Sequence, residues 1–222
     1  MTSTSTDLTG SAEGPTDEGH LPGRDAAFRR RERRDRLVLA GIQQIGTTGY
    51  DGTTVRGIAS DAGLADRYFY EHFSDRMQLF VAVYDSAVAR VQEAAVEAYL
   101  SAGADLGDQV QAGITTFVMA LTDDPRLARI QLVESVGRGG ALEARRSAVL
   151  RNYASLLEVQ AREVLADQQP SDLDLMMGTR ALVAATNQLI MDFTSGELVV
   201  ERDDLVEHLV RLYLDITRPF LS

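Results

Sequence analysis

Cysteine is absent from the 222-residue chain, which excludes several kinds of site at once. A disulfide bond, a thiolate zinc site, an iron–sulfur cluster and a cysteine nucleophile all require it. No apolar run approaches the length of about 18 residues that suggests a transmembrane helix. Residues 1–20 also lack the basic end and apolar run of a secretory signal. We therefore expect a soluble, cytoplasmic protein with no membrane partner.

Lysine is also absent, so the 22 basic residues are all arginine; they face 33 acidic residues, for a net charge of -11. Residues 1–23 hold four acids and no arginine, residues 24–80 hold ten arginines and eight acids, and residues 81–222 hold twelve arginines and 21 acids. The positive excess therefore lies in one early segment. An acidic chain with a locally basic segment can direct a nucleic acid to that segment.

The remaining composition, with 45% hydrophobic and 25% charged residues, is that of a globular protein with a core. Residues 1–23 are the exception, because they hold almost no apolar side chain, and we predict a disordered acidic tail there. Beyond the tail, an arginine-rich stretch leads into apolar residues that share one helical face from Leu37 to Ile45. This pattern predicts an amphipathic helix that ends near residues 46–49.

Two shorter helices follow in the sequence pattern. The first carries Val55, Ile58 and Ala59 and can be capped by Thr53 or Thr54. After a break that contains glycine, residues 66–72 predict another helix. Three helices in a short span, the last two joined by a turn with glycine, indicate a helix-turn-helix DNA-binding domain over residues 24–75.

Residues 76–222 form a larger domain whose periodic segments are all helical. Ser74 and Asp75 can cap the first of them, and no alternating β pattern of useful length occurs. The segments cover residues 76–100, 105–121, 125–135, 141–166, 171–195 and 201–217. The sequence therefore predicts an all-α fold, in which a three-helix helix-turn-helix head precedes a larger helical domain for ligand binding and dimerisation.

The last two helical segments are apolar on more than one side, so something must cover them. A second copy of the chain is the simplest cover, and we predict a homodimer. The alternative is that both helices are enclosed within one monomeric bundle. The expected interface residues are Ala181, Ala185, Leu189, Leu205, Leu209, Leu212 and Tyr213.

A family resemblance is concentrated between Gly49 and Leu79. The elements that carry it are GYDGTTVR at residues 49–56, Ile58–Ala59, Ala62–Gly63–Leu64, YFYEHF at residues 68–73, and Arg76 with Leu79. In this order and spacing they resemble the DNA-binding domain of TetR/AcrR-type transcriptional regulators. Residues 81–222 match that family only in length, helical content and position.

The resemblance implies that residues 53–60 are the supporting helix and residues 65–72 the recognition helix, which enters the major groove. Arg56 and Arg67 are the best candidates for base edges, because a guanidinium can bond guanine O6 and N7 together. Contacts with phosphate or with a thymine methyl group are implied for Thr53, Thr54, Tyr68, Tyr70, His72 and Arg76.

Two residues of the recognition helix depart from the family pattern. The family commonly has serine where this chain has Ala65, and a basic or small residue where it has Asp66. Ala65 cannot cap the helix, a loss of roughly 1 kcal/mol unless Asp66 caps it instead. Asp66 repels phosphate, but it can accept a hydrogen bond from a cytosine amino group or orient Arg67. The operator preference of a relative therefore does not transfer to this chain.

The arginines that precede this domain have two interpretations. Residues 24–36 hold seven arginines and three acids. Such a run is often only a solvated helix face. Directly before a helix-turn-helix, however, such an arm commonly reaches the adjacent minor groove or backbone. We therefore favour DNA contact by residues 29–34, without choosing among them.

No pattern of catalytic or metal-binding residues competes with this interpretation. His20, His72 and His208 lie far apart in the sequence, without the spacing of metal ligands. Residues 137–140 are rich in glycine but lack the preceding strand and the Gly-Lys-Ser/Thr ending of a phosphate-binding loop. We therefore expect no enzyme activity, no metal and no cofactor.

The larger domain is expected to enclose a cavity for a small-molecule effector. Asn187 and Asp192 lie in an otherwise apolar segment, and polar groups in apolar walls give small-molecule pockets their selectivity. The alternatives are core packing for most of the candidates and the dimer interface for Asn187. The candidate lining residues are Phe117, Met119, Gln131, Glu134, Arg151, Tyr153, Leu157, Met177, Asn187 and Met191.

The sequence therefore predicts a homodimeric transcriptional repressor that binds a double-stranded, pseudo-palindromic DNA operator and is released by a small-molecule effector. A different hypothesis is a helical small-molecule-binding protein or enzyme whose head no longer reads DNA. A third is an activator or an architectural DNA-binding protein without a ligand.

Overall fold

The structure is a computed structural model that describes residues 22–165 and 170–215. The predicted acidic tail lies outside these ranges except for Pro22 and Gly23, which begin the first helix. Within the ranges, every regular element is helical and no strand occurs, so the all-α fold is confirmed. The elements are α1 (Pro22–Thr48), α2 (Val55–Asp61), α3 (Asp66–Tyr70), α4 (Arg76–Ser101), α5 (Leu106–Asp123), α6 (Pro125–Ala128), the π-helical segment η1 (Arg129–Glu134), α7 (Gly140–Val164), α8 (Asp172–Ser195) and α9 (Arg202–Asp215).

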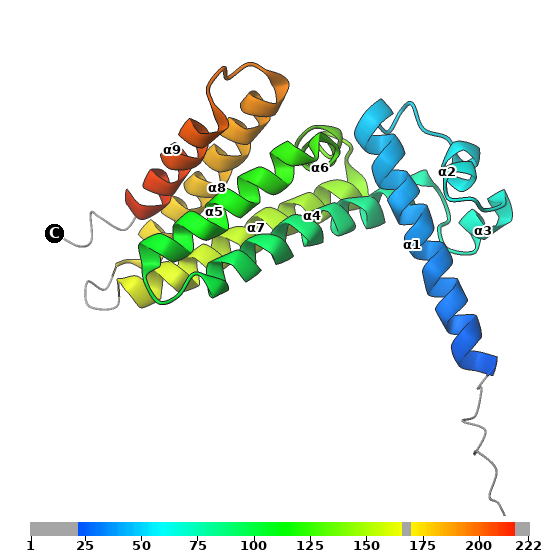
Figure 1. The fold of residues 1–222 in the computed structure, drawn as a ribbon, viewed down its shortest axis with the longest axis horizontal. Coiled ribbons are helices and arrows are strands. Elements are labelled where there is room, and N and C mark those ends of the chain that lie inside the picture. Colours follow the sequence, from blue (N-terminus) through cyan, green and yellow to red (C-terminus); the bar gives the residue numbers. More distant parts are fainter. Residues whose placement is uncertain (1–21, 166–169, 216–222) are drawn as a thin grey trace, which may run out of the picture.

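The helices form a small head and a larger, elongated body (Figure 1). The head consists of α1, α2 and α3 at one end of the molecule, and the body consists of α4–α9. Within the body, α4 packs against α5 and α7, α8 packs against α7, and α9 packs against α5. Because α4 begins at the head and runs along the body, it joins the two parts mechanically.

Side-chain caps determine where the helices begin. The Thr54 hydroxyl accepts a hydrogen bond from the Gly57 N–H at 3.0 Å, and the Asp75 carboxylate accepts one from the Gln78 N–H at 2.8 Å. Each bond satisfies a backbone donor that has no partner inside its own helix. Of the predicted cap candidates, Thr54 and not Thr53 caps α2, and Asp75 and not Ser74 caps α4. Ala65 stands at the N-cap of α3 with no side-chain cap.

We expect Asp75→Asn to lower the free energy of unfolding by about 0.3–1 kcal/mol at neutral pH. The effect is modest because Asp75 is exposed and asparagine can also cap a helix. Hydrogen bonds, first from the Gln78 backbone and then from Ser74, lower the pKa of the Asp75 carboxyl. A carboxyl whose pKa falls on folding stabilises the protein above its unfolded pKa of about 3.9, and the contribution disappears as the pH falls through the folded value. Urea unfolding should therefore show the difference at neutral pH and not in strong acid.

Asp35→Asn is the matched control for this prediction. It makes the same chemical change at an exposed position in α1, away from any helix start. Its difference from the parent protein should not follow the pH dependence expected for Asp75→Asn. A difference between Asp75→Asn and the parent that stays constant from neutral to strongly acid pH would contradict the role given to the carboxylate charge.

One apolar core runs from the head into the body. Leu37 of α1, Phe69 of α3 and Leu79 and Phe80 of α4 are fully buried, and they belong to a continuous cluster that extends to Leu209 of α9. The domain boundary predicted after residue 75 therefore lies between two segments that share one apolar core. Because packed interiors transmit small displacements, a movement of α4 acts directly on the head.

The sequence predicts one helix over residues 125–135, but in the structure only its first part is α-helical. The α-helical part ends at Ala128, and the chain continues as η1. Here the Arg129 guanidinium donates to the Thr47 carbonyl of α1 at 2.7 Å, and the Gln131 amide donates to the Ala87 carbonyl of α4 at 3.1 Å. Hydrophobic periodicity does not reveal a π-helical turn of this kind, because its partners lie in helices distant in the sequence.

Candidate nucleic-acid interface and internal cavity

α3 is held in the head by its buried face and by the turn that precedes it. Phe69 is fully buried, whereas Asp66, Arg67 and Tyr70 are exposed. The turn contains Gly63, whose φ of +63° favours glycine, and the Arg36 guanidinium donates to the Gly63 carbonyl at 3.3 Å. The N-terminal end of α3 is therefore fixed and open to solvent, which is the geometry needed for entry into a major groove.

A cationic cluster lies beside this end of α3. The guanidinium carbons of Arg33 and Arg67 each lie 4.8 Å from the centre of the Tyr68 ring. Arg67 also donates to the Tyr68 hydroxyl at 3.1 Å, and Arg33 lies 3.9 Å from the Glu71 carboxylate. These contacts orient two guanidinium groups that belong to different helices. A phosphate or a guanine edge could replace the Tyr68 hydroxyl as an acceptor for Arg67.

Most of the sequence-predicted DNA-contact residues lie at the surface of the head. Tyr68 is half-buried beneath the two arginines. His72 is also half-buried, and burial first and the charge of Arg30 second lower its pKa. Its imidazole is therefore uncharged at neutral pH and gives no cation for a phosphate. The exposed members are Thr54, Arg56, Ala65, Asp66, Arg67 and Tyr70.

Two predicted phosphate contacts have structural partners inside the protein. Thr53 is 2% exposed, and both its N–H and its hydroxyl donate to the Tyr50 carbonyl. Arg76 donates to the backbone carbonyls of Tyr50 and Thr53, and its guanidinium lies 4.9 Å from the centre of the Tyr50 ring. Thr53 thus has no surface for a phosphate, and Arg76 attaches the first turn of α4 to the loop between α1 and α2.

The arginine run divides into two groups. Arg33 and Arg36 brace the helix-turn-helix through the contacts described above, and the guanidinium of Arg34 lies 5.5 Å from the centre of the Phe73 ring. The preceding arginines, at positions 29–31, are exposed on the first half of α1. These three remain the candidates for an arm that contacts DNA.

A polar network joins the head to the body around Glu134, which is 8% exposed. Its carboxylate accepts hydrogen bonds from the Tyr50 N–H at 3.0 Å, from Arg138 at 2.9 Å and from Arg129 at 3.3 Å. Gly49 has a φ of +81°, and a Cβ built on it would lie 2.7 Å from the Glu134 carboxylate. Glu134 is a predicted cavity residue, but the structure places it at this junction.

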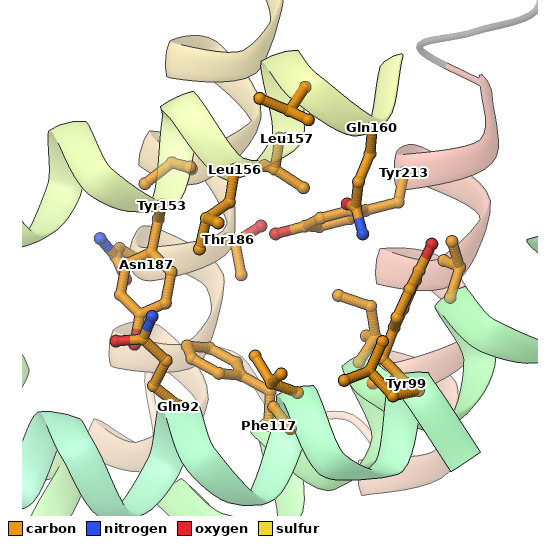
Figure 2. A pocket seen from close by; sticks show the side chains of 18 residues that line it. Gln92, Tyr99, Phe117, Tyr153, Leu156, Leu157, Gln160, Thr186, Asn187 and Tyr213 are labelled. Carbon is orange, nitrogen blue, oxygen red and sulfur yellow. The ribbon is translucent and has the colours of Figure 1, made fainter. Parts of the chain in front are cut away.

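The body contains a cavity of about 340 Å³ between α4, α5, α7, α8 and α9, and this cavity is partly open to solvent (Figure 2). Its walls are mainly apolar and contain no charged side chain. At one end, Gln92, Tyr153 and Asn187 lie close together; Tyr99, Gln160 and Tyr213 lie toward the other. The apolar lining consists of Ala95, Val96, Leu100, Val110, Ile114, Phe117, Leu156, Leu157, Val159 and Val183.

Four of the ten predicted cavity residues line this space: Phe117, Tyr153, Leu157 and Asn187. The other predicted residues lie elsewhere. Gln131 bonds to the α4 backbone, Glu134 lies at the junction, and Met191 packs against the core. Met119, Arg151 and Met177 are exposed. Residue type alone does not distinguish a cavity wall from a neighbouring helix face, because helix rotation within the bundle decides which side chains point inward.

The hydroxyl groups of two tyrosines in the cavity differ in their partners. Tyr213 is hydrogen-bonded to Thr186, and burial raises the pKa of Tyr213. Tyr153 has a buried hydroxyl with no hydrogen-bond partner, although its ring packs edge-on against Phe117 at 6.0 Å. Burial also raises the pKa of Tyr153, so its hydroxyl keeps its proton at neutral pH. Buried polar groups without a partner are rare; Tyr153 lines the cavity, but its hydroxyl is itself buried and lies beside the Gln92 side chain (Figure 2).

The predicted interface residues have unequal access to a second copy. Leu205 and Leu209 are 3% and 0% exposed and lie in the core of the chain itself, so neither has a surface for a second copy. Tyr213 lines the cavity. Ala185, Leu189 and Leu212 are half-buried, and Ala181 is exposed. The apolar arc of α9 is wide because one side of it packs on the core of the same chain, so a second copy is not needed to cover that side.

Residues 22–165 and 170–215 contain neither a membrane-spanning helix nor a cluster of metal ligands. Helices in this part of the chain are never both long and apolar enough to cross a membrane. The same residues contain no group of three or more His, Asp or Glu side chains placed to hold a metal ion.

Comparison with known proteins identifies the head. The sequence profile of a family described as "Bacterial regulatory proteins, tetR family" matches residues 37–83, from α1 into α4. An HTH-type transcriptional regulator of Haemophilus influenzae, itself uncharacterized, is 26% identical over 171 residues, which are 77% of this chain and 78% of that protein. Residues 37–83 therefore form a helix-turn-helix DNA-binding head of the tetR family type, and the chain is similar over most of its length to a transcriptional regulator.

Solved structures resemble the whole fold. The fatty acid degradation regulator FadR from Bacillus halodurans has a TM-score of 0.71 at 19% identity, covering 82% of this chain and 94% of that one. FadR from Bacillus subtilis, in complex with stearoyl-CoA, has a TM-score of 0.69 at 18% identity, covering 80% and 96%. At these identities the likeness establishes the architecture alone.

Proposed function

We propose that the protein is a homodimeric repressor that binds a pseudo-palindromic operator through α3 and releases it when an effector occupies the cavity. The observation that carries the proposal is the solvent-exposed N-terminal end of α3, where Arg67 lies beside Arg33 and Tyr68. A guanidinium at this place can reach a guanine edge once the helix enters a major groove. Thr54, exposed at the N-cap of α2, would contact the flanking backbone, and Arg56, exposed on α2, is a second candidate for a base edge.

The outer face of α8 supports a dimer. Leu173, Met177, Ala181 and Ala184 are exposed and follow one another at helical spacing, which makes one apolar stripe. A self-complementary stripe of this kind fits a two-fold interface between two copies. Such a dimer would present two α3 helices to major grooves about 34 Å apart, which is why we propose a pseudo-palindromic operator.

α4 supports the proposed response to an effector. Its first turn is attached to the head through Arg76, and its residues from Gln92 to Leu100 line the cavity. A ligand that displaces α4 would therefore move the head. If the ligand favours the displaced state by about 3 kcal/mol, the affinity for DNA falls by more than about a hundredfold. The stearoyl-CoA complex of the Bacillus subtilis regulator supports a small-molecule effector for this fold.

Fluorescence anisotropy with labelled DNA tests the DNA-binding function. We expect DNA from the region upstream of the protein's own gene to bind at least ~10³-fold more tightly than random DNA, and the affinity to fall as salt rises. Sedimentation should give a mass twice that of the 24.2 kDa chain. Equal competition by random DNA at every salt concentration would favour instead a small-molecule-binding protein or enzyme whose head does not read DNA.

A further inference from the structure

The glycine-rich segment at residues 137–140 forms the corner between η1 and α7. Gly137 and Gly139 have φ values of +70° and +66°, a conformation that favours glycine, and both are exposed. Arg138 between them is half-buried, because its side chain reaches back to Glu134 and across to Asp51 of the head. The corner therefore places one arginine of the body against the loop between α1 and α2.

All three nitrogens of the Arg138 guanidinium have an acceptor. One amino group lies 2.9 Å from each carboxylate oxygen of Asp51, and the other donates to the Glu134 carboxylate at 2.9 Å. Nε donates to the Glu134 carbonyl at 3.1 Å. A planar group with donors bound on several sides can adopt only one orientation. Asp51 is therefore held at a fixed place relative to η1.

The α1–α2 loop, residues 49–54, is where the body holds the helix-turn-helix. The Tyr50 ring contacts two guanidinium groups, those of Arg76 and Arg138, at 4.9 and 5.0 Å from its centre. The same ring stacks on Phe80 of α4 at 5.1 Å. The loop ends at Thr54, the N-cap of α2, and α2 and α3 pack on α1 and on each other. Contacts with this loop therefore act on the direction of α2 and α3.

Arg138 also connects the head to a second helix of the cavity. Arg76 is the first residue of α4, and Arg138 lies two residues before the start of α7. Both helices run along the body (Figure 1), and both contribute side chains to the cavity. The α1–α2 loop is thus bound at the head-side ends of two helices that line the cavity.

The contribution of Arg138 is one of direction more than of stability. The apolar core that runs from the head into the body holds the two parts together, but hydrophobic burial is not directional. The Asp51 carboxylate is 80% exposed, so its ion pair with Arg138 adds little to the free energy of unfolding. Its two hydrogen bonds, in contrast, depend on the angle between the groups. A rotation of the head on the body would break them.

We propose that Arg138 is a positioning residue for DNA binding, which fixes the orientation of the head on the body. In a dimer this orientation determines the distance and angle between the two α3 helices, and therefore the spacing of half-sites that the protein accepts. The consequence for spacing rests on the proposed function, because it requires a dimer and an operator. Without Arg138, each head keeps its DNA-contact surface but not its direction.

Distances between spin labels test the orientation in the full-length protein without DNA. Because the chain has no cysteine, labels can be attached at two introduced cysteines, Ser60→Cys on α2 and Ser155→Cys on α7, both at exposed positions. Dilution with unlabelled protein limits the measurement to distances within one chain. We expect Arg138→Ala to broaden or shift the distribution of distances relative to the parent.

Arg146→Ala is the matched control. Arg146 also lies on α7, and its side chain is 26% exposed against 24% for Arg138, but its partner Glu143 belongs to the same helix. Its loss should leave the distances as they are in the parent. Asp51→Ala removes the head's side of the contact at an exposed position, so the protein should still fold. We expect Asp51→Ala to change the distances in the same way as Arg138→Ala.

Operator binding tests the consequence for half-site spacing. We expect Arg138→Ala to bind the full operator about five- to 100-fold more weakly, because two loosened heads must be ordered on binding, and to bind a single half-site within about twofold of the parent. One base pair inserted between the half-sites should weaken the parent more than the variant. A protein that is only destabilised would lose affinity for the half-site and for the operator alike.

The two measurements separate this inference from the proposed function. Unchanged distances in both Arg138→Ala and Asp51→Ala would overturn the inference, as would an equal change in Arg146→Ala. Changed distances with an unchanged preference for half-site spacing would also overturn it. If the distances change as expected but the parent binds no operator, Arg138 fixes the head and the repressor function fails.

Discussion

Arg67→Ala is expected to weaken operator binding by roughly 30-fold to 10⁴-fold. A bidentate contact between a guanidinium and a guanine edge discriminates by about 5- to 150-fold, and a dimer would carry two copies of the substitution. Arg67 is exposed at the N-terminal end of α3, so the loss comes from the interface with DNA and not from the fold. Anisotropy with operator DNA and with random DNA should show a large loss for the first and a small loss for the second.

Arg162→Ala is the matched control for Arg67→Ala. It removes the same charge from the far part of α7, where the guanidinium pairs with Asp172. Because both variants change the net charge equally, a general electrostatic effect would appear in both. If Arg67→Ala lowers the affinity for operator and for random DNA by the same factor, Arg67 contacts phosphate and not a base. Another residue then determines the specificity, and Arg56 is the first candidate.

Glu134→Ala is expected to lower the free energy of unfolding by about 2–4 kcal/mol, because hydrogen bonds to charged groups are costly to lose when their partners remain buried. The substitution leaves the Tyr50 N–H, Arg129 and Arg138 without their shared acceptor. The expected loss of stability is smaller than for a fully buried ion pair, because the side chains of Arg129 and Arg138 both reach solvent. For a chain of this length the midpoint of thermal unfolding should fall by about 5–15 °C.

Two further variants show whether the loss of stability comes from the hydrogen bonds to the Glu134 carboxylate. Glu207→Ala removes a carboxylate from an exposed pair with Arg211 at 3.9 Å, and its stability should stay within about 0.5 kcal/mol of the parent. Glu134→Gln keeps an acceptor for the Tyr50 N–H and should recover part of the loss. A Glu134→Ala protein as stable as Glu207→Ala would mean that the junction between head and body is held by the apolar core alone.

Local sequence signals were sufficient for the order of the helices and for several of their starts. Asp75 and Thr54 cap helices through bonds to N–H groups three residues away, so the information lies within one turn of the chain. The same holds for the glycine in the α2–α3 turn, because a positive φ is a local demand. The arrangement of the helix-turn-helix could therefore be predicted from residues 24–75 without knowledge of the body.

Burial and partnership were decided by the tertiary structure. Thr53 and Thr54 are adjacent and identical in type, yet one is enclosed and bonded to Tyr50 while the other is exposed. Arg76 fits a family position near phosphate, but its donors reach the carbonyls of the α1–α2 loop. Glu134 is 84 residues from Tyr50 in sequence, and only the packing of η1 against α1 makes them partners.

By itself, then, the sequence determined an all-helical chain with a DNA-binding head of the TetR family, because helix periodicity, caps and turn residues act over a few residues. The tertiary structure alone decided which side chains surround the cavity and that the Tyr153 hydroxyl lies in its wall without a partner. Five helices contribute to that cavity, and the rotation of each about its axis depends on all the others. Such a collective arrangement is not contained in the pattern of any single segment.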